Sequence, residues 1–384
     1  MRFLHTADWH LGRLLHGINL TEDQSHVLDQ IVKMAKELRA DAVLISGDIY
    51  DRAVPPPEAV ALLDDVVSRL TLGLGLSVVL IAGNHDSPQR LSFGSRLFEA
   101  TRLHVVGALP AEPRPVVVAD SDGPVHIYPV PYAEPPVVRE RLGCPGIATH
   151  QQALEEILAR IRRAHPKGTR SVLMAHAFVA GGEESESERP LSVGGVATVD
   201  GSSFRGFDYV ALGHLHSPQR VSRESVRYPG SLLKYSVPEA IHEKSVNLIA
   251  LDAGGKANVE RIALEPRRDL RIIEGQLVDV LKGPGPGENK DDYIHVRLLD
   301  RAPIFDPMGK LREVYPNVLN FKRVHLEAAG DAAQARRGIE KLTHRELFAA
   351  FFQDVTGDGL REEESAAYVA TVESLERQER EGAP

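Results

Sequence analysis

The sequence predicts an α/β fold, in which parallel strands alternate with helices and end on polar residues. Residues 42–47 form an apolar run that closes on a glycine and leads into Asp48, which is typical of a buried parallel strand. Apolar residues repeat at helical spacing after Thr21 and again after Pro57, on either side of that strand. Because α/β proteins usually place their chemistry at the carboxyl ends of such strands, we expect the functional site beside Asp48.

Five apolar runs predict strands that end on polar groups. The runs are residues 3–7, 42–46, 78–82, 172–175 and 209–212, and they lead into Asp8 and His10, Asp48, Asn84 with His85 and Asp86, His176, and His214 with His216. Thr21 and Gln24 match a capping box at the start of the first helix. A further helix is expected through Leu154 and Leu158, and short β-rich runs between residues 102 and 132 suggest an antiparallel layer.

The later part of the chain predicts a second, smaller unit. Strands are expected at residues 221–228, 245–252 and 259–264, and the charged stretch 265–268 marks a boundary. An α+β unit follows, with a helix that starts at Asp306 and Pro307, and then a glycine-containing linker from Gly330 to Gly338. Two helices are expected after Thr343. We therefore predict domains at residues 1–266, 267–330 and 340–384.

Composition indicates a soluble globular protein with a sizeable core. Hydrophobic residues make up 42% and charged residues 26% of the 384 residues. Cys144 is the single cysteine, which favours a reducing, cytoplasmic setting, and no stretch is apolar enough to span a membrane. A net charge of −9 argues against coating nucleic acid through bulk charge, but it does not exclude a local basic groove or a metal-centred phosphate site.

Residues 183–188 form an acidic run with the sequence EESESE. Charge runs of this kind are usually solvated, mobile loops, and that is the favoured interpretation. An acidic gate beside the functional site is the alternative, and the sequence alone does not decide between the two.

The polar groups at the strand ends predict a site for two metal ions. The set contains carboxylate, amide and imidazole groups and no thiolate, which suits Mn, Fe or Zn rather than a structural zinc. Two divalent ions and two carboxylates would leave a charge of about +2, which attracts a phosphate. Such a pair of ions, roughly 3.5–4 Å apart, serves the hydrolysis of phosphate esters. His85 would then be free to act as an acid–base group, with Asp86 orienting it or a ligand.

The same motifs resemble the five motifs of the calcineurin-like metallophosphoesterases, and the resemblance covers nearly the whole chain but is most specific before about residue 236. They are Asp8-Trp9-His10, Gly47-Asp48, Gly83-Asn84-His85-Asp86, His176 and Gly213-His214-Leu215-His216. The resemblance implies a four-layer α/β/β/α sandwich with a small α+β capping domain and C-terminal helices. It assigns one ion to Asp8, His10, Asp48 and His216, and the other to Asp48, Asn84, His176 and His214. It makes His85 the catalytic residue that is not a ligand.

The surrounding sequence resembles the branch of this family that cuts DNA. The closest contexts are residues 5–12, 46–51 and 228–232, and we expect Tyr228, Gly230 and Ser231 to approach substrate. The resemblance implies a nuclease with two Mn²⁺ ions that acts as a double-strand exonuclease and a single-strand or hairpin endonuclease. Its implied roles are DNA end processing, repair, recombination and replication. It also implies a homodimer and an ATPase partner. Some relatives carry a catalytic His shortly after the bridging Asp, whereas this chain has Asp51 there.

Two other functions stay open at this stage. One is a small-molecule phosphodiesterase or phosphomonoesterase on the same fold, and the other is a DNA-binding scaffold with a vestigial site. The additional unit after Arg268 argues against the first, because a minimal phosphoesterase does not need it. The complete set of ligands together with His85 argues against the second.

Three lesser patterns complete the prediction. The segment 354–359 loosely resembles a calcium-binding loop, but Thr356 and Ser365 replace ligand residues, so we expect a helix–helix turn. Two sets of basic residues could face DNA, although a solvated surface is the default for such clusters: Arg160, Arg162, Arg163, Lys167 and Arg170, and Arg267, Arg268, Arg271, Arg297 and Arg301. Finally, one apolar stripe is expected to bind the ATPase partner rather than the body of this protein: Leu347, Phe348, Phe351, Phe352 and Val355.

Overall fold

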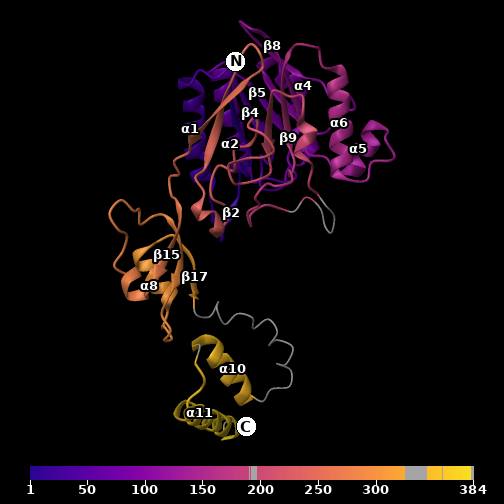
Figure 1. Cartoon of the computed structure of the whole chain (residues 1–384). Coiled ribbons are helices and arrows are strands. Elements are labelled where there is room, and N and C mark those ends of the chain that lie inside the picture. Colours follow the sequence, from indigo (N-terminus) through magenta and orange to yellow (C-terminus); the bar gives the residue numbers. More distant parts are fainter. Residues whose placement is uncertain (190, 192–196, 325–343, 357, 382–384) are drawn as a thin grey trace. The chain divides into compact units, whose positions relative to one another are not determined.

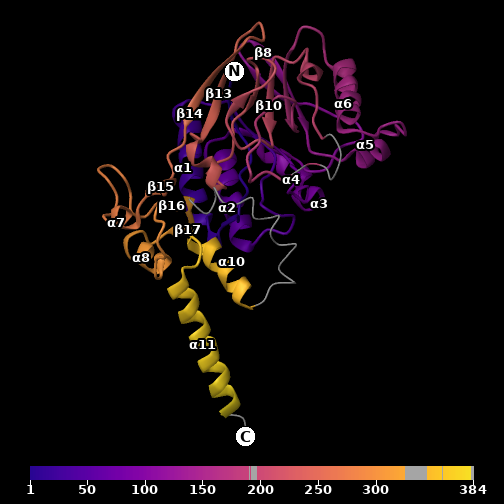
Figure 2. The same ribbon diagram turned by 60° about the horizontal axis from the view of Figure 1, so that its bottom comes forward.

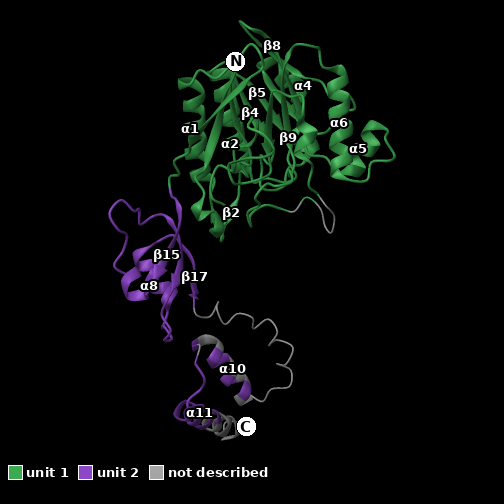
Figure 3. Ribbon diagram, in the orientation of Figure 1, with its two compact units in different colours: residues 1–267 green, residues 268–384 purple. Residues whose placement is uncertain are grey.

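The computed structural model of the chain describes residues 1–189, 191, 197–324, 344–356 and 358–381. The chain divides into two compact units, Met1–Arg267 and Arg268–Pro384 (Figure 3). Among the described residues, no helix is both long enough and apolar enough to cross a membrane. The expected linker from Gly330 to Gly338, and Thr343, lie outside the described residues.

Two six-stranded sheets form the first unit. In the first sheet, two antiparallel pairings extend four parallel strands on one side, in the order β14 (Ala257–Ala263), β13 (Ser245–Leu251), β1 (Arg2–Thr6), β4 (Ala42–Ser46), β5 (Ser77–Ile81) and β6 (Leu103–Val106). In the second sheet, four parallel strands lie between antiparallel edges, in the order β11 (Gln219–Arg220), β12 (Val226–Tyr228), β10 (Tyr209–Gly213), β9 (Arg170–His176), β8 (Gly123–Val130) and β7 (Val116–Asp120).

The two sheets pack face to face and helices cover their outer faces (Figures 1 and 2). Phe3, Leu44 and Val79 of the first sheet share one buried cluster with Val172 and Tyr209 of the second. On the outer face of the second sheet, another cluster joins its strands to the buried stripes of two helices, α5 (Pro135–Leu142) and α6 (His150–Ala164). Two further helices, α1 (Thr21–Glu37) and α2 (Pro57–Ser68), lie along the first sheet. The structure therefore confirms the α/β/β/α arrangement.

Two local predictions need correction. The antiparallel pairing expected between residues 102 and 132 is confirmed for β7 and β8, but these strands belong to the second sheet and β6 joins the first sheet in parallel, so they form no separate layer. The capping box at Thr21 is also absent. Oδ1 of Asn19 accepts hydrogen bonds from both the N–H and the hydroxyl of Thr21, at 2.8 and 2.6 Å. The side chain of Gln24 is buried and does not bond to Thr21. Gln24 instead donates to the carbonyls of Trp9 and His10, at 3.0 and 2.8 Å, so it supports a loop that carries candidate ligands.

Short elements connect these layers. They are β2 (Leu14–Leu15), β3 (Ile18–Asn19), the π-helix η1 (Arg69–Gly73), α3 (Pro88–Leu91), α4 (Ser95–Phe98), and the 3₁₀ helices η2 (Glu99–Thr101), η3 (Gly201–Phe204) and η4 (Val237–Ile241). The hairpin of β2 and β3 follows the loop that carries His10, and η4 contains Glu239, which lies 3.7 Å from Nδ1 of His216.

The second unit contains a three-stranded parallel sheet in the order β15 (Leu270–Gly275), β16 (Tyr293–Leu298) and β17 (Val318–Arg323). Two helices, α7 (Leu277–Val280) and α8 (Pro307–Val314), pack on it around Ile294 and Val296. Asp306 caps α8 by accepting the N–H of Gly309, as the sequence predicted. The helices α10 (His344–Thr356) and α11 (Glu362–Glu381) follow, and the calcium-loop-like segment falls at the end of α10 and in the turn after it.

Candidate metal centre

The predicted site residues lie on tight turns at the carboxyl ends of the central strands. Asp8, His10 and Asp48 have positive φ angles of 53°, 47° and 47°, a backbone conformation that costs free energy in residues other than glycine. Gly47 permits a close approach between the two sheets, because a Cβ atom there would lie 2.2 Å from Nδ1 of His176. The local sequence therefore brings the ends of β1, β4 and β9 together.

One group of side chains gathers around His10. The ligand atoms of Asp8, His10 and His216 lie within 4.8 Å of one another, and all three residues are buried. Nε2 of His10 lies 3.0 Å from Nε2 of His216 and 3.7 Å from Oδ2 of Asp48. Two neutral imidazoles at this distance either share one N–H···N hydrogen bond or turn both lone pairs toward a shared cation. With Asp8 and Asp48 beside them, the second arrangement would suit a metal ion.

A second group gathers around His176. The ligand atoms of Asp48, His176 and His214 also lie within 4.8 Å of one another. Nε2 of His176 is 2.9 Å from Oδ1 of Asn84 and 3.5 Å from Oδ2 of Asp48. The same oxygen of Asp48 thus faces both groups, which is the position that a ligand shared by two ions requires.

Burial and charge set the protonation of these groups. Burial lowers the pKa of His10 well below its usual range, and it lowers the pKa of His214 to about 3, so both imidazoles offer lone pairs. Burial would raise the pKa of Asp48, but the adjacent His176 holds it well below its usual range. Burial likewise opposes the charge on His176, yet Asp48 raises the pKa of that imidazole to about 9. Of these four groups, His176 is therefore the one from which a divalent cation would have to displace a proton.

His85 lies beside both groups without belonging to the expected ligand sets. Its Nδ1 donates to the carbonyl of Asp51 at 2.8 Å, and its Nε2 lies 4.0 Å from Oδ2 of Asp48. Its backbone N–H donates to Oδ1 of Asp48 at 2.9 Å. The ring is 10% exposed, whereas His10 is fully buried. His10, Asp51 and His85 also form a third set whose ligand atoms lie within 4.8 Å of one another.

Asp86 is placed to hold backbone turns. Its carboxylate accepts the N–H groups of Ile49, Tyr50 and Gly83, at 3.1, 3.0 and 2.9 Å. These bonds tie the turn after Asp48 to the turn that carries Asn84. This placement favours a positioning role for Asp86 over contact with reacting atoms.

Tyr228, Gly230 and Ser231 lie beneath the site rather than at its surface. Tyr228 is 1% exposed, donates to the carbonyl of Ala177 at 2.6 Å and accepts the N–H of Val179. Ser231 is fully buried and donates to the carbonyl of Leu233 at 2.8 Å. A Cβ atom on Gly230 would lie 2.7 Å from the carbonyl of His216. These contacts favour support of the loops after His176 and His216 over contact with substrate.

Sequence reasoning missed several residues that surround His10. Arg13 donates to Oδ1 of Asp51 at 2.9 Å and lies over the ring of Tyr235, 5.3 Å from its centroid. The hydroxyl of Tyr235 donates to the carbonyl of Trp9 at 2.5 Å. Nδ1 of His10 lies 3.6 Å from Oδ1 of Asp51 and has no hydrogen-bond partner among the described residues. No local pattern marks Arg13 or Tyr235, because their partners are far away in the sequence.

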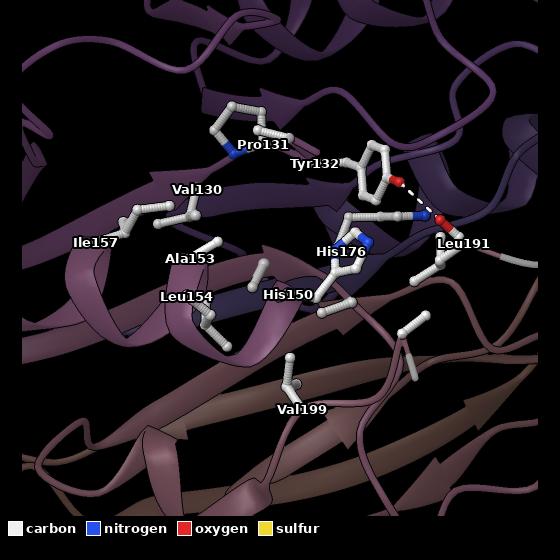
Figure 4. Close-up of a pocket in the computed structure, with 14 residues that line it drawn as sticks. Val130, Pro131, Tyr132, His150, Ala153, Leu154, Ile157, His176, Leu191 and Val199 are labelled. Atoms are coloured by element: carbon white, nitrogen blue, oxygen red, sulfur yellow. Dashed lines mark hydrogen bonds between the residues drawn. The ribbon is translucent and has the colours of Figure 1, made fainter. Parts of the chain in front are cut away.

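A small, mostly apolar pocket flanks the second group (Figure 4). Tyr132 stacks on His150 with ring centroids 5.9 Å apart and meets the ring of His176 edge-on. The Tyr132 hydroxyl donates to the carbonyl of Leu191 at 3.2 Å. The pocket therefore gives the His176 side of the site an aromatic wall.

Comparisons with known proteins agree with this fold. A family model described as calcineurin-like phosphoesterase matches residues 1–218, and one described as type 5 capsule protein repressor C-terminal domain matches residues 266–356. The fold and the site thus define a calcineurin-like phosphoesterase, a metal-dependent phosphodiester hydrolase.

The particular family follows from two curated relatives, each of which is the SbcD component of the nuclease SbcCD. One is from Staphylococcus epidermidis and is 33% identical, and the other is from Staphylococcus saprophyticus subsp. saprophyticus and is 34% identical. Each match spans 365 residues, or 95% of this chain and 96% of the relative. The chain belongs to the SbcD family. Among solved structures, a dimetal phosphatase from Danio rerio is similar with a TM-score of 0.40 and 14% identity, over 69% of this chain and 99% of that one.

Proposed function

We propose that this chain is the Mn²⁺-dependent nuclease component of an SbcCD-type complex and hydrolyses DNA phosphodiesters with two metal ions. The observation that carries the proposal is the shared position of Asp48, whose Oδ2 lies 3.7 Å from Nε2 of His10 and 3.5 Å from Nε2 of His176. The expected activities are those of a double-strand exonuclease and a single-strand or hairpin endonuclease in the processing of DNA ends.

The seven side chains divide into two ligand sets. Asp8, His10, Asp48 and His216 would hold one ion, and Asp48, Asn84, His176 and His214 would hold the other. Two divalent ions in such a site supply a nucleophile at neutral pH and stabilise the charge of an in-line displacement. With two carboxylates in the set, the loaded site keeps a net positive charge that attracts a DNA phosphate despite the chain's charge of −9.

His85 is the proposed acid–base residue. The bond from Nδ1–H to the carbonyl of Asp51 fixes the ring, so Nε2 faces the site and is the atom that exchanges protons there: the doubly protonated ring would give a proton from Nε2 to the leaving oxygen, and the neutral ring would accept one. The partial exposure of the ring also lets a phosphate reach it.

The second unit is proposed to select the DNA rather than to cut it, because it carries none of the seven ligands. Several of its basic side chains are already paired: Arg271 with Asp292 at 2.7 Å and Arg297 with Glu274 at 2.9 Å. Two members of the basic cluster near α6 are likewise engaged within the protein, since Arg160 pairs with Glu156 at 2.8 Å and Arg170 with Asp120. Among the arginines of the second unit, exposed Arg301 is therefore a better candidate for contact with the DNA backbone than Arg271 or Arg297.

The helices α10 and α11 are proposed to bind the ATPase of the complex, SbcC. Phe348 stacks on Tyr368 at 4.1 Å, so the two helices share an aromatic contact. Phe351 remains 61% exposed, and Ala349, Leu360 and Val369 line a groove between the helices. The side chains of Leu347 and Val355 lie outside the described residues. An apolar groove, and separately an exposed aromatic side chain, are features that suit contact with an apolar helix of a partner.

A homodimer and a cytoplasmic location complete the proposal. On the first unit, Phe93 and Leu97 are 83% and 78% exposed and lie four residues apart. Large exposed apolar side chains such as these are available for protein–protein contact, and we propose that they take part in the dimer contact.

One assay separates the proposed function from its alternatives. Purified protein is incubated with Mn²⁺ and either linear duplex DNA or a small aryl phosphodiester. Cleavage of both is expected, with loss of both after chelation of the metal. Cleavage of the small ester alone would favour a small-molecule phosphoesterase, and cleavage of neither would favour a DNA-binding scaffold.

A further inference from the structure

The acidic segment 183–188 is not simply a solvated loop. Glu183, Glu184 and Glu186 are exposed, but Ser187 is only 9% exposed and Glu188 is half-buried. The carboxylate of Glu188 accepts the backbone N–H of His216 at 2.5 Å and that of Ser185 at 2.5 Å. The end of this segment is thus attached to the backbone of a candidate metal ligand.

Ser187 contacts the side chain of the same ligand. Its Oγ lies 2.5 Å from Nδ1 of His216, and its hydroxyl donates to Oε1 of Glu239. Glu239 lies 3.7 Å from Nδ1 of His216, which is too far for a direct hydrogen bond. Ser187 therefore bridges an imidazole and a carboxylate that do not bond to each other.

Glu239 is itself firmly held. It is fully buried and pairs with Lys244 at 2.6 Å. Lys244 also donates to the carbonyl of His216 at 2.8 Å and to Oγ of Ser231 at 2.9 Å. A buried ion pair whose donors and acceptors are engaged forms a rigid network, and here the network encloses His216.

The segment is also tied to the opposite side of the site. Arg13 donates to the carbonyl of Ser187 at 3.3 Å and to the carboxylate of Asp51 at 2.9 Å. The carbonyl of Asp51 in turn accepts from Nδ1 of His85. Arg13 thus connects the segment to the residue that holds the proposed acid–base group.

We propose that Ser187 and Glu188 are positioning residues that fix His216 in the orientation and tautomer needed to bind a metal ion. Because Nδ1–H of His216 donates to Ser187, Nε2 keeps its lone pair, and that lone pair faces His10. Partners of this kind, behind a ligating histidine, typically contribute about 10- to 100-fold to metal affinity. The inference rests on the proposed function, because it concerns one of the two proposed ions.

The coupling between the ordered segment and the ion that His216 would hold must act in both directions. If the ordered segment strengthens binding of the ion that His216 holds, then that ion must also stabilise the ordered segment. Mn²⁺ should therefore protect residues 183–188 from a protease that cleaves after glutamate, and the exposed Glu183, Glu184 and Glu186 supply its cleavage sites.

The test measures Mn²⁺ binding to the full chain by calorimetry and by metal content after dialysis. Ser187→Ala and Glu188→Ala are each expected to weaken one of two ions by about 10- to 100-fold and to leave the other unchanged. Glu186→Ala removes an exposed acid from the same segment and should bind both ions like the wild type. Protease protection is measured on the wild type, so the test does not depend on the folding of any variant.

The outcomes separate the two proposals. The positioning role would be overturned if Ser187→Ala and Glu188→Ala bound both ions with wild-type affinity. It would also be overturned if the protease cut the segment equally fast with and without Mn²⁺. A wild-type chain that binds no divalent ion would instead overturn the proposed function.

Discussion

Replacing His85 with alanine separates catalysis from metal binding. The substitution removes the ring but keeps the backbone N–H that donates to Asp48 at 2.9 Å, so the shared ligand retains that contact. The hydrogen bond from Nδ1 to the carbonyl of Asp51 is lost, and it contributes about 0.5–1.5 kcal/mol to the free energy of unfolding at most sites. We therefore expect His85→Ala to fold and to bind two ions.

The substitution should raise the activation free energy of DNA cleavage by more than it lowers the free energy of unfolding. General acid–base groups contribute about 10²- to 10⁴-fold to a rate, which corresponds to about 2.7–5.4 kcal/mol of activation free energy. The assay compares initial rates on linear duplex DNA with Mn²⁺ content. His26→Ala, which removes a histidine of α1 that no ligand set includes, is the matched control and should cut at the wild-type rate. Loss of an ion in His85→Ala, or cleavage at the wild-type rate, would refute the role assigned to His85.

Four further predictions concern the shared ligand, the two C-terminal parts and one ion pair. Asp48→Ala should reduce the content of both ions, as measured by mass spectrometry of the metal, whereas His214→Ala should reduce mainly one; an Asp48 variant that holds two ions would rule out the shared position. Removal of residues 268–326 should spare hydrolysis of an aryl phosphodiester and reduce cleavage of duplex ends, and an equal loss of both activities in a folded variant would contradict this division. A chain that ends near residue 338 should keep Mn²⁺-dependent cleavage but fail to co-purify with the ATPase; retention of the ATPase would place the interface elsewhere. Arg170, hydrogen-bonded to Asp120, holds the pKa of that carboxyl well below its usual range, so the stabilisation is present above the carboxyl's ordinary pKa and is lost as the pH falls through the depressed value. Asp120→Asn should therefore lower the free energy of unfolding at pH 7 by about 2 kcal/mol, as measured by denaturant titration. The difference in free energy between the variant and the wild type should be smaller in strong acid, and a difference that does not change with pH would contradict the ion-pair explanation.

The strand ends could be predicted from the sequence because their signal is local. An apolar run followed by glycine and a polar group specifies a buried strand and its terminal side chain within about ten residues, as at Asp48 and His176. The two sheets then place these ends side by side, so residues 206 positions apart, His10 and His216, come within 3.0 Å. The first unit's layers follow from the same alternation of strands and helices.

The supporting contacts could not be predicted in this way. Gln24 carries the sequence signal of a cap, but Asn19 satisfies Thr21 and leaves Gln24 to bind the carbonyls of Trp9 and His10. Ser187 lies in a run whose charge suggests solvent exposure, yet it meets Glu239, which is 52 residues away. Such contacts depend on how loops from the two sheets meet, and no local pattern of residue types predicts that arrangement.

The most direct test of the two-ion proposal is anomalous diffraction from crystals of the protein grown with Mn²⁺. The account predicts two anomalous peaks, one among Asp8, His10, Asp48 and His216, and the other among Asp48, Asn84, His176 and His214, with Asp48 contacting both. A single peak, or a peak held by His10, Asp51 and His85, would contradict the shared position of Asp48 and the role of His85 as a residue that is not a ligand.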